Sequence, residues 1–281
     1  MPELPEVEIV KRGMARSMQG CAVDSVVFNR GDLRFPLPES LPESLRGRVL
    51  ARLQRRGKYI LGFAAGGAGF VLHLGMSGRI KIFEPDQAYV PQKHDHVVIR
   101  MEGGVVVVLN DARRFGFLLG VDEQSWEKGE PFASMGPEPL ENEFDGPCLQ
   151  RALEARRGPI KPALLDQHAV AGIGNIYACE ALFRAGIAPQ RPACSLNADE
   201  ASALVRALKA VLLEAIEAGG SSLRDYHNTK GDLGYFQHHF AVYDRAGHGC
   251  PGCDCDRIKT GGVQRIVQGG RSTFYCPYKQ G

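Results

Sequence analysis

The chain opens with Met1-Pro2-Glu3-Leu4-Pro5-Glu6-Val7-Glu8, the most informative stretch of its 281 residues. An initiator methionine is normally removed before a residue as small as proline, which exposes Pro2 as a free secondary amine. Because an α-amino group titrates near pH ~8, much of this amine is neutral at cellular pH. Such an amine can attack a sugar carbon and form an iminium, with Glu3 and Glu6 close enough to move protons. The alternative is an ordinary proline-rich entry to a helix.

The sequence around this opening predicts a helix followed by a β-rich region. Proline suits a first helical turn, so a short helix is expected to begin near Pro5, with Val7, Val10 and Met14 on one face. The next hundred residues contain two pairs of strand-like segments, each joined by a glycine-rich turn typical of a hairpin. These segments are Tyr59–Phe63 with Gly69–Leu74, and Val97–Met101 with Val105–Leu109.

The second half of the chain is predicted to be helical. Residues 132–146 are rich in Pro, Glu, Asp and Gly, which indicates a linker. Asn197 and Glu200 have the spacing of a capping box, and Gly219-Gly220 is expected to end the helix that follows. Its apolar face would consist of Leu204, Leu208, Val211, Leu212 and Ile216.

Charge and hydropathy limit the possible partners. The net charge is only +2, from 34 basic and 32 acidic residues, so composition alone does not indicate that the chain binds a nucleic acid. Adjacent arginines at 55–56, 113–114 and 156–157 are either phosphate contacts or ordinary solvated faces. No apolar run approaches the ~18 residues of a membrane span. The acidic, proline-rich start lacks the features of a secretory signal, which predicts a cytoplasmic protein that does not bind membranes.

Four of the eight cysteines crowd the last 32 residues, namely Cys250, Cys253, Cys255 and Cys276. In a cytoplasmic chain this arrangement favours a metal site over disulfides.

The opening and eight further sequence blocks in order make the chain resemble the formamidopyrimidine-DNA glycosylases, bacterial enzymes that excise oxidised purines. Leu4 favours this branch over its endonuclease VIII relatives, which usually have glycine at that position. Besides the opening, the blocks include Arg55–Tyr59, His73–Gly78, Lys93–His96, Asp111–Gly116, Gly136–Leu140, Ile160–Pro162, Gly172–Ala178 and Gly270–Cys276.

The resemblance implies a role for individual residues in catalysis. Pro2 would be the Schiff-base nucleophile, and Glu3 would handle protons during base loss. Lys58, on a hairpin loop, would assist β-elimination, and Arg271 would contact a phosphate and serve δ-elimination. Without the resemblance, Lys58 is a surface lysine and Arg271 an ordinary turn residue.

The resemblance also implies how damaged double-stranded DNA is held. A base must leave the stack before it can react, and side chains must fill the space that it leaves. Met76, Arg113 and Phe115 would fill that void, although core packing is the alternative for Met76 and Phe115. Further DNA contacts would come from His94, Arg113, Arg156, Lys161 and Asn175. Residues 221–235 match the family's loop over the flipped base.

The metal site is where the sequence departs from the family pattern of two Cys-x2-Cys pairs. Cys250 and Cys253 form the first pair and Cys276 supplies a third ligand, but the fourth position holds Lys279. The span from Cys253 to Cys276 is also longer than usual and contains Cys255. Structural zinc prefers four thiolate or imidazole ligands. The site therefore either binds one Zn²⁺ through Cys250, Cys253, Cys255 and Cys276, with His248 as the next candidate, or has lost the metal.

These observations together predict an α+β protein. Residues 1–131 would form a catalytic β-sandwich flanked by helices, 132–146 a linker, 147–240 a helix-two-turn-helix DNA-binding domain and 241–281 a zinc-finger-type β-hairpin. The expected activity is that of a bifunctional glycosylase and apurinic/apyrimidinic lyase. The protein is expected to be a monomer in the bacterial cytosol and to need no small-molecule cofactor. The alternatives are a glycosylase for oxidised pyrimidines, a lesion-binding protein without chemistry, and a zinc-binding transcription factor. The preferred lesion and the opposite base are not predicted.

Overall fold

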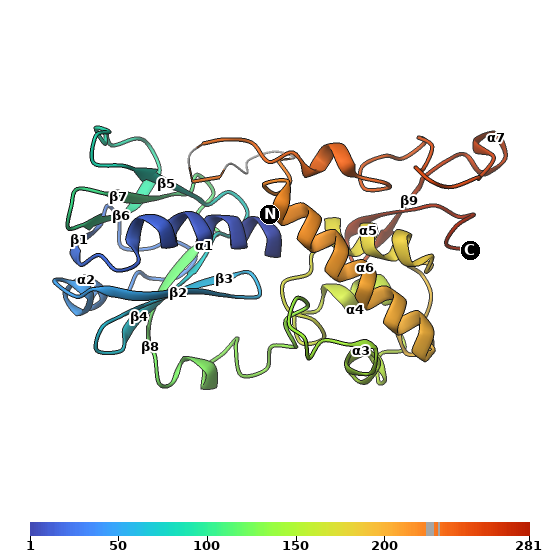
Figure 1. Cartoon of the computed structure of the whole chain (residues 1–281), viewed down its shortest axis with the longest axis horizontal. Helices are drawn as coiled ribbons and strands as arrows, with labels where there is room; N and C mark the ends of the chain where they lie inside the picture. Colours follow the sequence, from blue (N-terminus) through green and yellow to red (C-terminus); the bar gives the residue numbers. More distant parts are fainter. Residues whose placement is uncertain (223–227, 230) are drawn as a thin grey trace. The chain divides into compact units, whose positions relative to one another are not determined.

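A computed structural model describes residues 1–222, 228–229 and 231–281 of the chain. The predicted loop over the flipped base spans residues 221–235, and residues 223–227 and 230 of this loop lie outside the described residues. The described chain divides into two compact units, Met1–Ala133 with Ala218–Tyr235, and Ser134–Glu217 with Phe236–Gly281 (Figure 1). The first unit thus includes a segment from within the range predicted as the helix-two-turn-helix domain.

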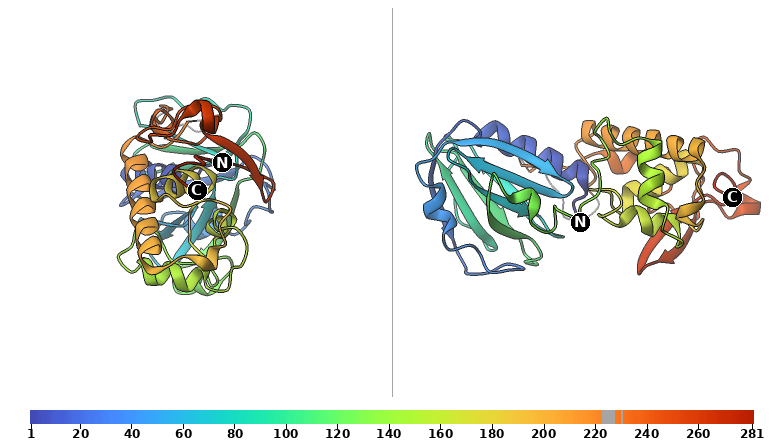
Figure 2. Two further views of the ribbon diagram at one scale, coloured as in Figure 1. Left: turned by 90° about the vertical axis from the view of Figure 1, so that its right-hand side faces the viewer. Right: turned by 90° about the horizontal axis from the view of Figure 1, so that it is seen from below.

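The first unit contains two antiparallel sheets and the helix α1 (Leu4–Met18), which packs on β2 (Figure 2). One sheet has the strand order β1-β6-β7-β5 and the other β2-β3-β4-β8. The strands of the first sheet are β1 (Val23–Phe28), β5 (Arg79–Phe83), β6 (Asp95–Met101) and β7 (Val106–Asn110). Those of the second are β2 (Leu50–Arg56), β3 (Tyr59–Ala64), β4 (Ala68–His73) and β8 (Phe117–Asp122). The short helices are α2 (Leu41–Leu45) and the 3₁₀ turn η1 (Trp126–Lys128).

A large apolar core connects the two sheets and α1, as expected for a sandwich. Val7, Val10 and Met14, the predicted inner face of α1, are each 1% exposed within this core. Both predicted hairpins are confirmed, since β3 pairs with β4 and β6 with β7, with ends shifted by one or two residues.

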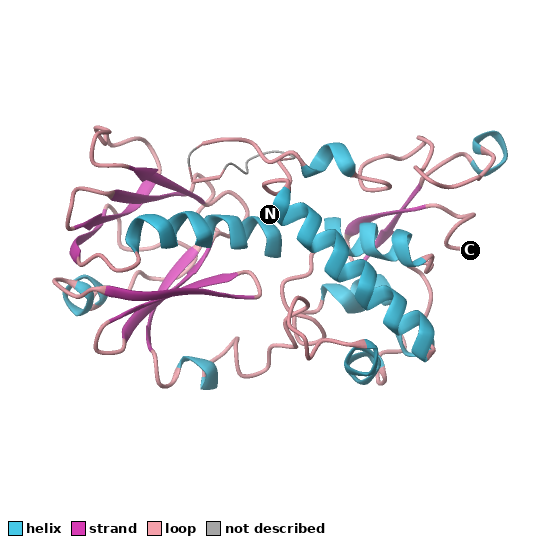
Figure 3. Cartoon of the chain, in the orientation of Figure 1, coloured by secondary structure: helices cyan, strands magenta, loops and turns pink. Residues whose placement is uncertain are grey.

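The second unit is mainly helical, with a two-stranded hairpin at its C-terminal end (Figure 3). Helix α6 packs on α3 and α5, and α5 also packs on β10. The elements are α3 (Gly146–Leu153), α4 (Ile160–Leu165), α5 (Asn175–Ala185), η2 (Ala193–Ser195), α6 (Ala198–Glu217), η3 (Phe236–His239), α7 (Arg257–Thr260), β9 (Gln264–Gln268) and β10 (Arg271–Tyr275).

Local sequence signals explain where α6 begins and how the hairpin turns. The Asn197 Oδ1 accepts the N–H of Glu200 and the Glu200 carboxylate accepts the N–H of Asn197, both at 2.9 Å, so the predicted capping box is confirmed. Between β9 and β10 the turn residues Gly269 and Gly270 have φ of 54° and 73°, as a tight type I′ turn requires. The predicted α+β fold with a C-terminal hairpin is thus confirmed, while the domain boundaries stay predictions.

Candidate active site and metal centre

The N-terminal turn of α1 is held by a buried carboxylate. Glu3, the residue before the helix, is 4% exposed, and Glu6 is 2% exposed. The Glu6 carboxylate accepts the N–H of Glu3 at 2.8 Å and the N–H of Ser221, in the same unit, at 2.9 Å. One hydrogen bond therefore fixes the main chain directly after Pro2, which is itself buried, and the other connects the same carboxylate to Ser221.

Lys58 lies in the tight turn between β2 and β3, as predicted, and is only 7% exposed. The strand that precedes it is tied to α1, because the Arg55 guanidinium donates to Glu8 at 3.2 Å and to the carbonyl of Gly57 at 3.0 Å. Burial opposes ionisation of Glu8, but Lys11, Arg12 and Arg55 outweigh it and hold the pKa of this carboxyl below its ordinary value. A charged Glu8 thus connects the helix that bears Glu3 to the hairpin that bears Lys58.

Met76, Arg113 and Phe115 lie on two loops of the first unit, one between β4 and β5 and one between β7 and β8. Met76 is 40% and Phe115 is 44% exposed, so neither side chain is packed in the core. The exposed Arg113 guanidinium lies 4.8 Å from the centre of the Phe115 ring, a cation–π distance. Core packing, the alternative for Met76 and Phe115, is therefore inconsistent with the structure.

His73 ends β4 directly before the loop of Met76. Its ring stacks on Phe117 at 5.1 Å, and its Nδ1 accepts the N–H of Gly75 at 3.0 Å. Burial, followed by the positive charges of Lys58 and Arg34, lowers the pKa of His73 to about 4. A neutral imidazole with a free Nδ1 lone pair is what this hydrogen bond requires.

The lowered pKa predicts a loss of stability in acid. Since the unfolded chain binds a proton at His73 near pH ~6.5 and the folded chain only near pH 4, the contribution is complete above pH ~6.5 and is lost as the pH falls towards 4. Its size is roughly 3–4 kcal/mol, at about 1.4 kcal/mol per pKa unit. His73→Phe keeps an aromatic ring and should show a smaller fall in urea-unfolding free energy between pH ~7 and ~4.5. A fall parallel to that of the wild type would contradict this prediction.

The remaining predicted contacts are distributed over both units. His94, in the first unit, is half-buried and has a φ of 73° in the loop before β6. In the second unit the Arg156 guanidinium pairs with Asp166 at 2.5 Å. Arg271 is exposed at the start of β10, beside the Gly269-Gly270 turn.

Lys161 and Asn175 form a polar network with the hairpin of the second unit. Lys161 is fully buried, and its ammonium donates to the Asn175 Oδ1 and to the carbonyl of Ser272, the latter at 3.3 Å. The Asn175 amide donates to the same carbonyl at 2.9 Å. Both side chains therefore hold the main chain immediately after Arg271.

The four C-terminal cysteines form a metal-type cluster. All four Sγ atoms lie within 4.8 Å of one another, with Cys250 and Cys255 at 3.3 Å and Cys253 and Cys276 at 3.7 Å. A tetrahedron of sulfurs at ~2.3 Å from zinc has edges of about 3.8 Å, so the cluster fits a single ion. Residues 253–256 belong to no strand, and the extra sequence continues into α7, which removes the geometric conflict of two ligands two residues apart in a strand. These cysteines can hold one metal ion.

Lys279 stands where the family pattern has its fourth cysteine, and its side chain points to an aromatic ring instead of a metal ion. Its Nζ lies 4.3 Å from the centre of the Phe183 ring, while its main-chain N–H donates to the Cys276 Sγ at 3.5 Å. Burial opposes ionisation of Cys276, but hydrogen bonds from this N–H, from the Tyr278 N–H and from the thiols of Cys250 and Cys253 hold the pKa of Cys276 below its ordinary value. Lys279 thus supports the cluster through its backbone.

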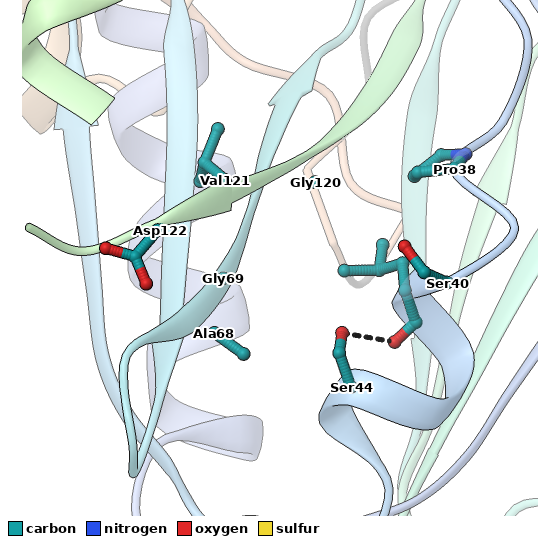
Figure 4. A pocket seen from close by; sticks show the side chains of 9 residues that line it. Pro38, Ser40, Ser44, Ala68, Gly69, Gly120, Val121 and Asp122 are labelled. Atoms are coloured by element: carbon teal, nitrogen blue, oxygen red, sulfur yellow. Dashed lines mark hydrogen bonds between the residues drawn. The ribbon is translucent and has the colours of Figure 1, made fainter. Parts of the chain in front are cut away.

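A shallow pocket of about 430 Å³ lies elsewhere in the first unit, between α2 and the edge of β8 (Figure 4). Its lining includes Ser40, Ser44 and Asp122, but none of the predicted site residues. The Ser44 hydroxyl is engaged by the carbonyl of Leu41 at 2.9 Å. This pocket offers no acid–base pair for the proposed chemistry.

Comparison with known proteins identifies the family. Residues 1–118 match the formamidopyrimidine-DNA glycosylase N-terminal domain, and residues 135–227 match the H2TH domain of the same enzymes. The formamidopyrimidine-DNA glycosylase of Cereibacter sphaeroides is 53% identical over the full length of both chains.

The chain belongs to the formamidopyrimidine-DNA glycosylase family.

Solved structures of formamidopyrimidine-DNA glycosylases agree with the fold. The MutM (Fpg) protein of Thermus thermophilus is 40% identical and superposes with a TM-score of 0.85, covering 99% of this chain and 98% of that one. A Lactococcus lactis Fpg mutant in complex with Fapy-dG-containing DNA is 30% identical with a TM-score of 0.87, covering 99% of each chain. Within the described ranges, no helix has the length and apolar character needed to cross a bilayer.

Proposed function

We propose that this formamidopyrimidine-DNA glycosylase family member is a bifunctional enzyme of base excision repair. It excises 8-oxoguanine and formamidopyrimidines from double-stranded DNA and then nicks the strand by β,δ-elimination, in the bacterial cytosol. The observation that carries the proposal is the buried start of α1, where Pro2 and Glu3 share one compact unit with a buried Lys58. The Fapy-dG DNA bound by the L. lactis relative supports the substrate class.

The Pro2 amine is the nucleophile. Its lone pair attacks C1′ of the damaged nucleotide, the bond to the base breaks, and the departing base takes up a proton. With Glu3 protonating the sugar ring oxygen, the ring opens and an iminium joins Pro2 to C1′. Loss of a C2′ proton then expels the 3′ phosphate, which is β-elimination. A second elimination expels the 5′ phosphate, and hydrolysis of the iminium frees Pro2.

The cations act on the phosphates during these steps. Lys58 stabilises the negative charge of the first leaving phosphate, and its burial strengthens that attraction. The exposed guanidinium of Arg271 contacts a phosphate and assists the second elimination, while Lys161 and Asn175 hold its hairpin. His94 and Arg156 add contacts to the DNA backbone, Arg156 by exchanging its partner Asp166 for a phosphate.

Met76, Arg113 and Phe115 fill the space left by the displaced nucleotide. Their exposure leaves them available to the duplex, since neither loop buries them in the protein. Phe115 separates the stacked bases, and Arg113 offers planar donors to the orphaned base.

The metal of the cysteine cluster is proposed to be one structural Zn²⁺ held by Cys250, Cys253, Cys255 and Cys276. When bound, zinc supplies folding free energy to a hairpin with little core of its own. The chain's own contribution is the hairpin turn, which presents Arg271 to the DNA.

Borohydride trapping tests the proposed function. The protein is mixed with an 8-oxoguanine duplex or a thymine-glycol duplex, and the imine is reduced to a stable adduct. With the 8-oxoguanine duplex we expect a covalent complex of protein and DNA. In samples without borohydride we expect a nicked strand with a phosphate at both ends of the gap. A stronger adduct on thymine glycol would assign the enzyme to oxidised pyrimidines. Binding without any adduct would indicate a lesion-binding protein and contradict the proposal.

Salt should weaken duplex binding steeply. Phosphate contacts are proposed for Lys58, Asn175 and Arg271 and for the arginines Arg56, Arg114, Arg156 and Arg157, and about six cations give a slope of roughly −5 in a plot of log K against log salt concentration. Fluorescence anisotropy with an uncleavable abasic-analogue duplex measures this slope without turnover. A slope near zero would contradict the electrostatic account.

A further inference from the structure

Beneath Met76, Arg113 and Phe115 lies a buried polar cluster, formed by Asp111 and Ser77, that joins their two loops. Asp111 is the first residue after β7 and is 0% exposed, and Ser77, one residue after Met76, is 8% exposed. The Ser77 hydroxyl donates to the Asp111 Oδ1 at 2.5 Å. A buried carboxylate is costly unless its oxygens are well paired, so its presence here calls for a reason.

Both carboxylate oxygens of Asp111 are engaged by the loop that it begins. The N–H of Arg113 points between the Asp111 Oδ1, at 3.3 Å, and the Ser77 Oγ, at 3.2 Å. The N–H of Gly116 donates to the Asp111 Oδ2 at 2.8 Å. Arg113 and Phe115 are thus held at both ends of a short segment by one side chain, which also holds the loop of Met76 through Ser77.

Backbone contacts complete the connection between the loops. Gly75 has a φ of 62°, and a Cβ at this position would lie 2.3 Å from the carbonyl carbon of Phe115. The main chain of the first loop therefore packs directly against that of the second, and only glycine fits there. On the other side, the His96 Nε2 bonds the carbonyl of Asp111 at 2.9 Å.

We propose that Asp111 and Ser77 are positioning residues that fix the three void-filling side chains before DNA binds. This inference rests on the proposed function, because it assumes that Met76, Arg113 and Phe115 enter the duplex. A preformed wedge pays no ordering cost when a base is displaced, so loss of the cluster should slow base displacement selectively. Asparagine at position 111 keeps the shape, but its NH₂ group opposes one of the N–H donors that the carboxylate accepts.

The test compares two substrates on the same protein sample. Excision from an 8-oxoguanine duplex requires a stacked base to be displaced, whereas cleavage of a preformed abasic site does not, because the base is already gone. Asp111→Asn should slow excision about tenfold or more, as a misplaced group commonly does, and should leave abasic-site cleavage within about twofold of the wild type. The ratio of the two rates is independent of the fraction of protein that is folded. The fluorescence of a 2-aminopurine beside the lesion should rise less than with wild type.

Matched variants separate positioning from general damage. Val108 is a buried residue of the same strand, β7. Val108→Ala removes apolar packing without changing Asp111 or Ser77, and it should leave the ratio of the two rates unchanged. Ser77→Ala removes the hydrogen bond from Ser77 to Asp111 and should lower the ratio of excision to abasic-site cleavage less than Asp111→Asn does. This variant replaces Asp111→Asn in the test if Asp111→Asn does not fold. Equal losses on both substrates, or a ratio like that of Val108→Ala, would overturn the inference. Wild-type protein that processes neither substrate would instead refute the proposed function.

Discussion

Pro2→Gly should lower the rate of 8-oxoguanine excision by about a hundredfold or more, because the secondary amine that forms the iminium is replaced by a primary amine that lacks the proline ring. Binding to an uncleavable abasic-analogue duplex should survive, since the phosphate contacts proposed for Lys58, Asn175 and Arg271 do not involve Pro2. The borohydride-trapped adduct should fall in step with excision. Single-turnover rates at saturating protein measure the chemical step apart from binding.

Pro5→Gly is the matched control for this result. Pro5 lies in the first turn of α1 and is buried like Pro2, so the same change in residue type affects the helix start while the terminal amine remains a proline. A chain with residues added before Pro2 provides a second comparison, because its amine becomes an amide and should be inactive. Wild-type excision and trapping by Pro2→Gly, or by the extended chain, would refute the assignment of the nucleophile.

Local signals in the sequence predicted the framework of the fold because each depends on residues close in the chain. The capping box of Asn197 and Glu200 needs a spacing of three, and the apolar face of α1 repeats every three or four residues. The hairpins of the sandwich follow from strand pairs joined by glycine turns. Which sheet each hairpin joins depends on contacts between distant strands, and the sequence did not predict this.

The family resemblance implied a void-filling role for Met76, Arg113 and Phe115, but the sequence did not predict what supports these side chains. Asp111 and Ser77 both lie within the blocks that carry the family resemblance, yet they are 34 residues apart and their hydrogen bond exists only in the fold. A lone aspartate directly after an apolar strand was the available signal, since it invites the question of how its charge is satisfied. The burial of Lys161 was not predicted either. A single sequence does not show whether a lysine is exposed or, as here, buried against Asn175 and Ser272.

The metal site shows how a departure from a pattern can be resolved by geometry. Sequence reasoning left Cys255, His248 and loss of the metal as alternatives, because a spacing of two residues places both cysteines on one face of a regular strand. The chain avoids this conflict by forming no strand at residues 253–256 and by starting α7 at Arg257, where the Asp256 carboxylate caps the helix. The convergence of four Sγ atoms within 4.8 Å favours Cys255 as the fourth ligand.

Cys255→Ser should therefore remove most of the zinc from the purified protein. Wild-type protein prepared without chelator is expected to contain about one zinc per chain, as four thiolates complete a closed structural site. The variant should bind zinc at least about a hundredfold more weakly, since losing a ligand exceeds the effect of losing an outer-shell partner. Metal analysis and competition with a chromogenic chelator measure both quantities.

Cys194→Ser is the control, because Cys194 is an exposed cysteine of the same unit that lies outside the cluster, and its zinc content should equal that of the wild type. Lys279→Ala gives a sharper comparison, since the main-chain N–H to Cys276 and all four thiols remain while the contact with Phe183 is lost. It should keep its zinc. Full occupancy in Cys255→Ser would exclude Cys255 as a ligand, whereas wild-type protein without any metal would exclude zinc itself. If zinc serves only to hold the hairpin, Cys255→Ser should lose δ-elimination, for which we propose Arg271, before it loses excision, for which we propose Pro2.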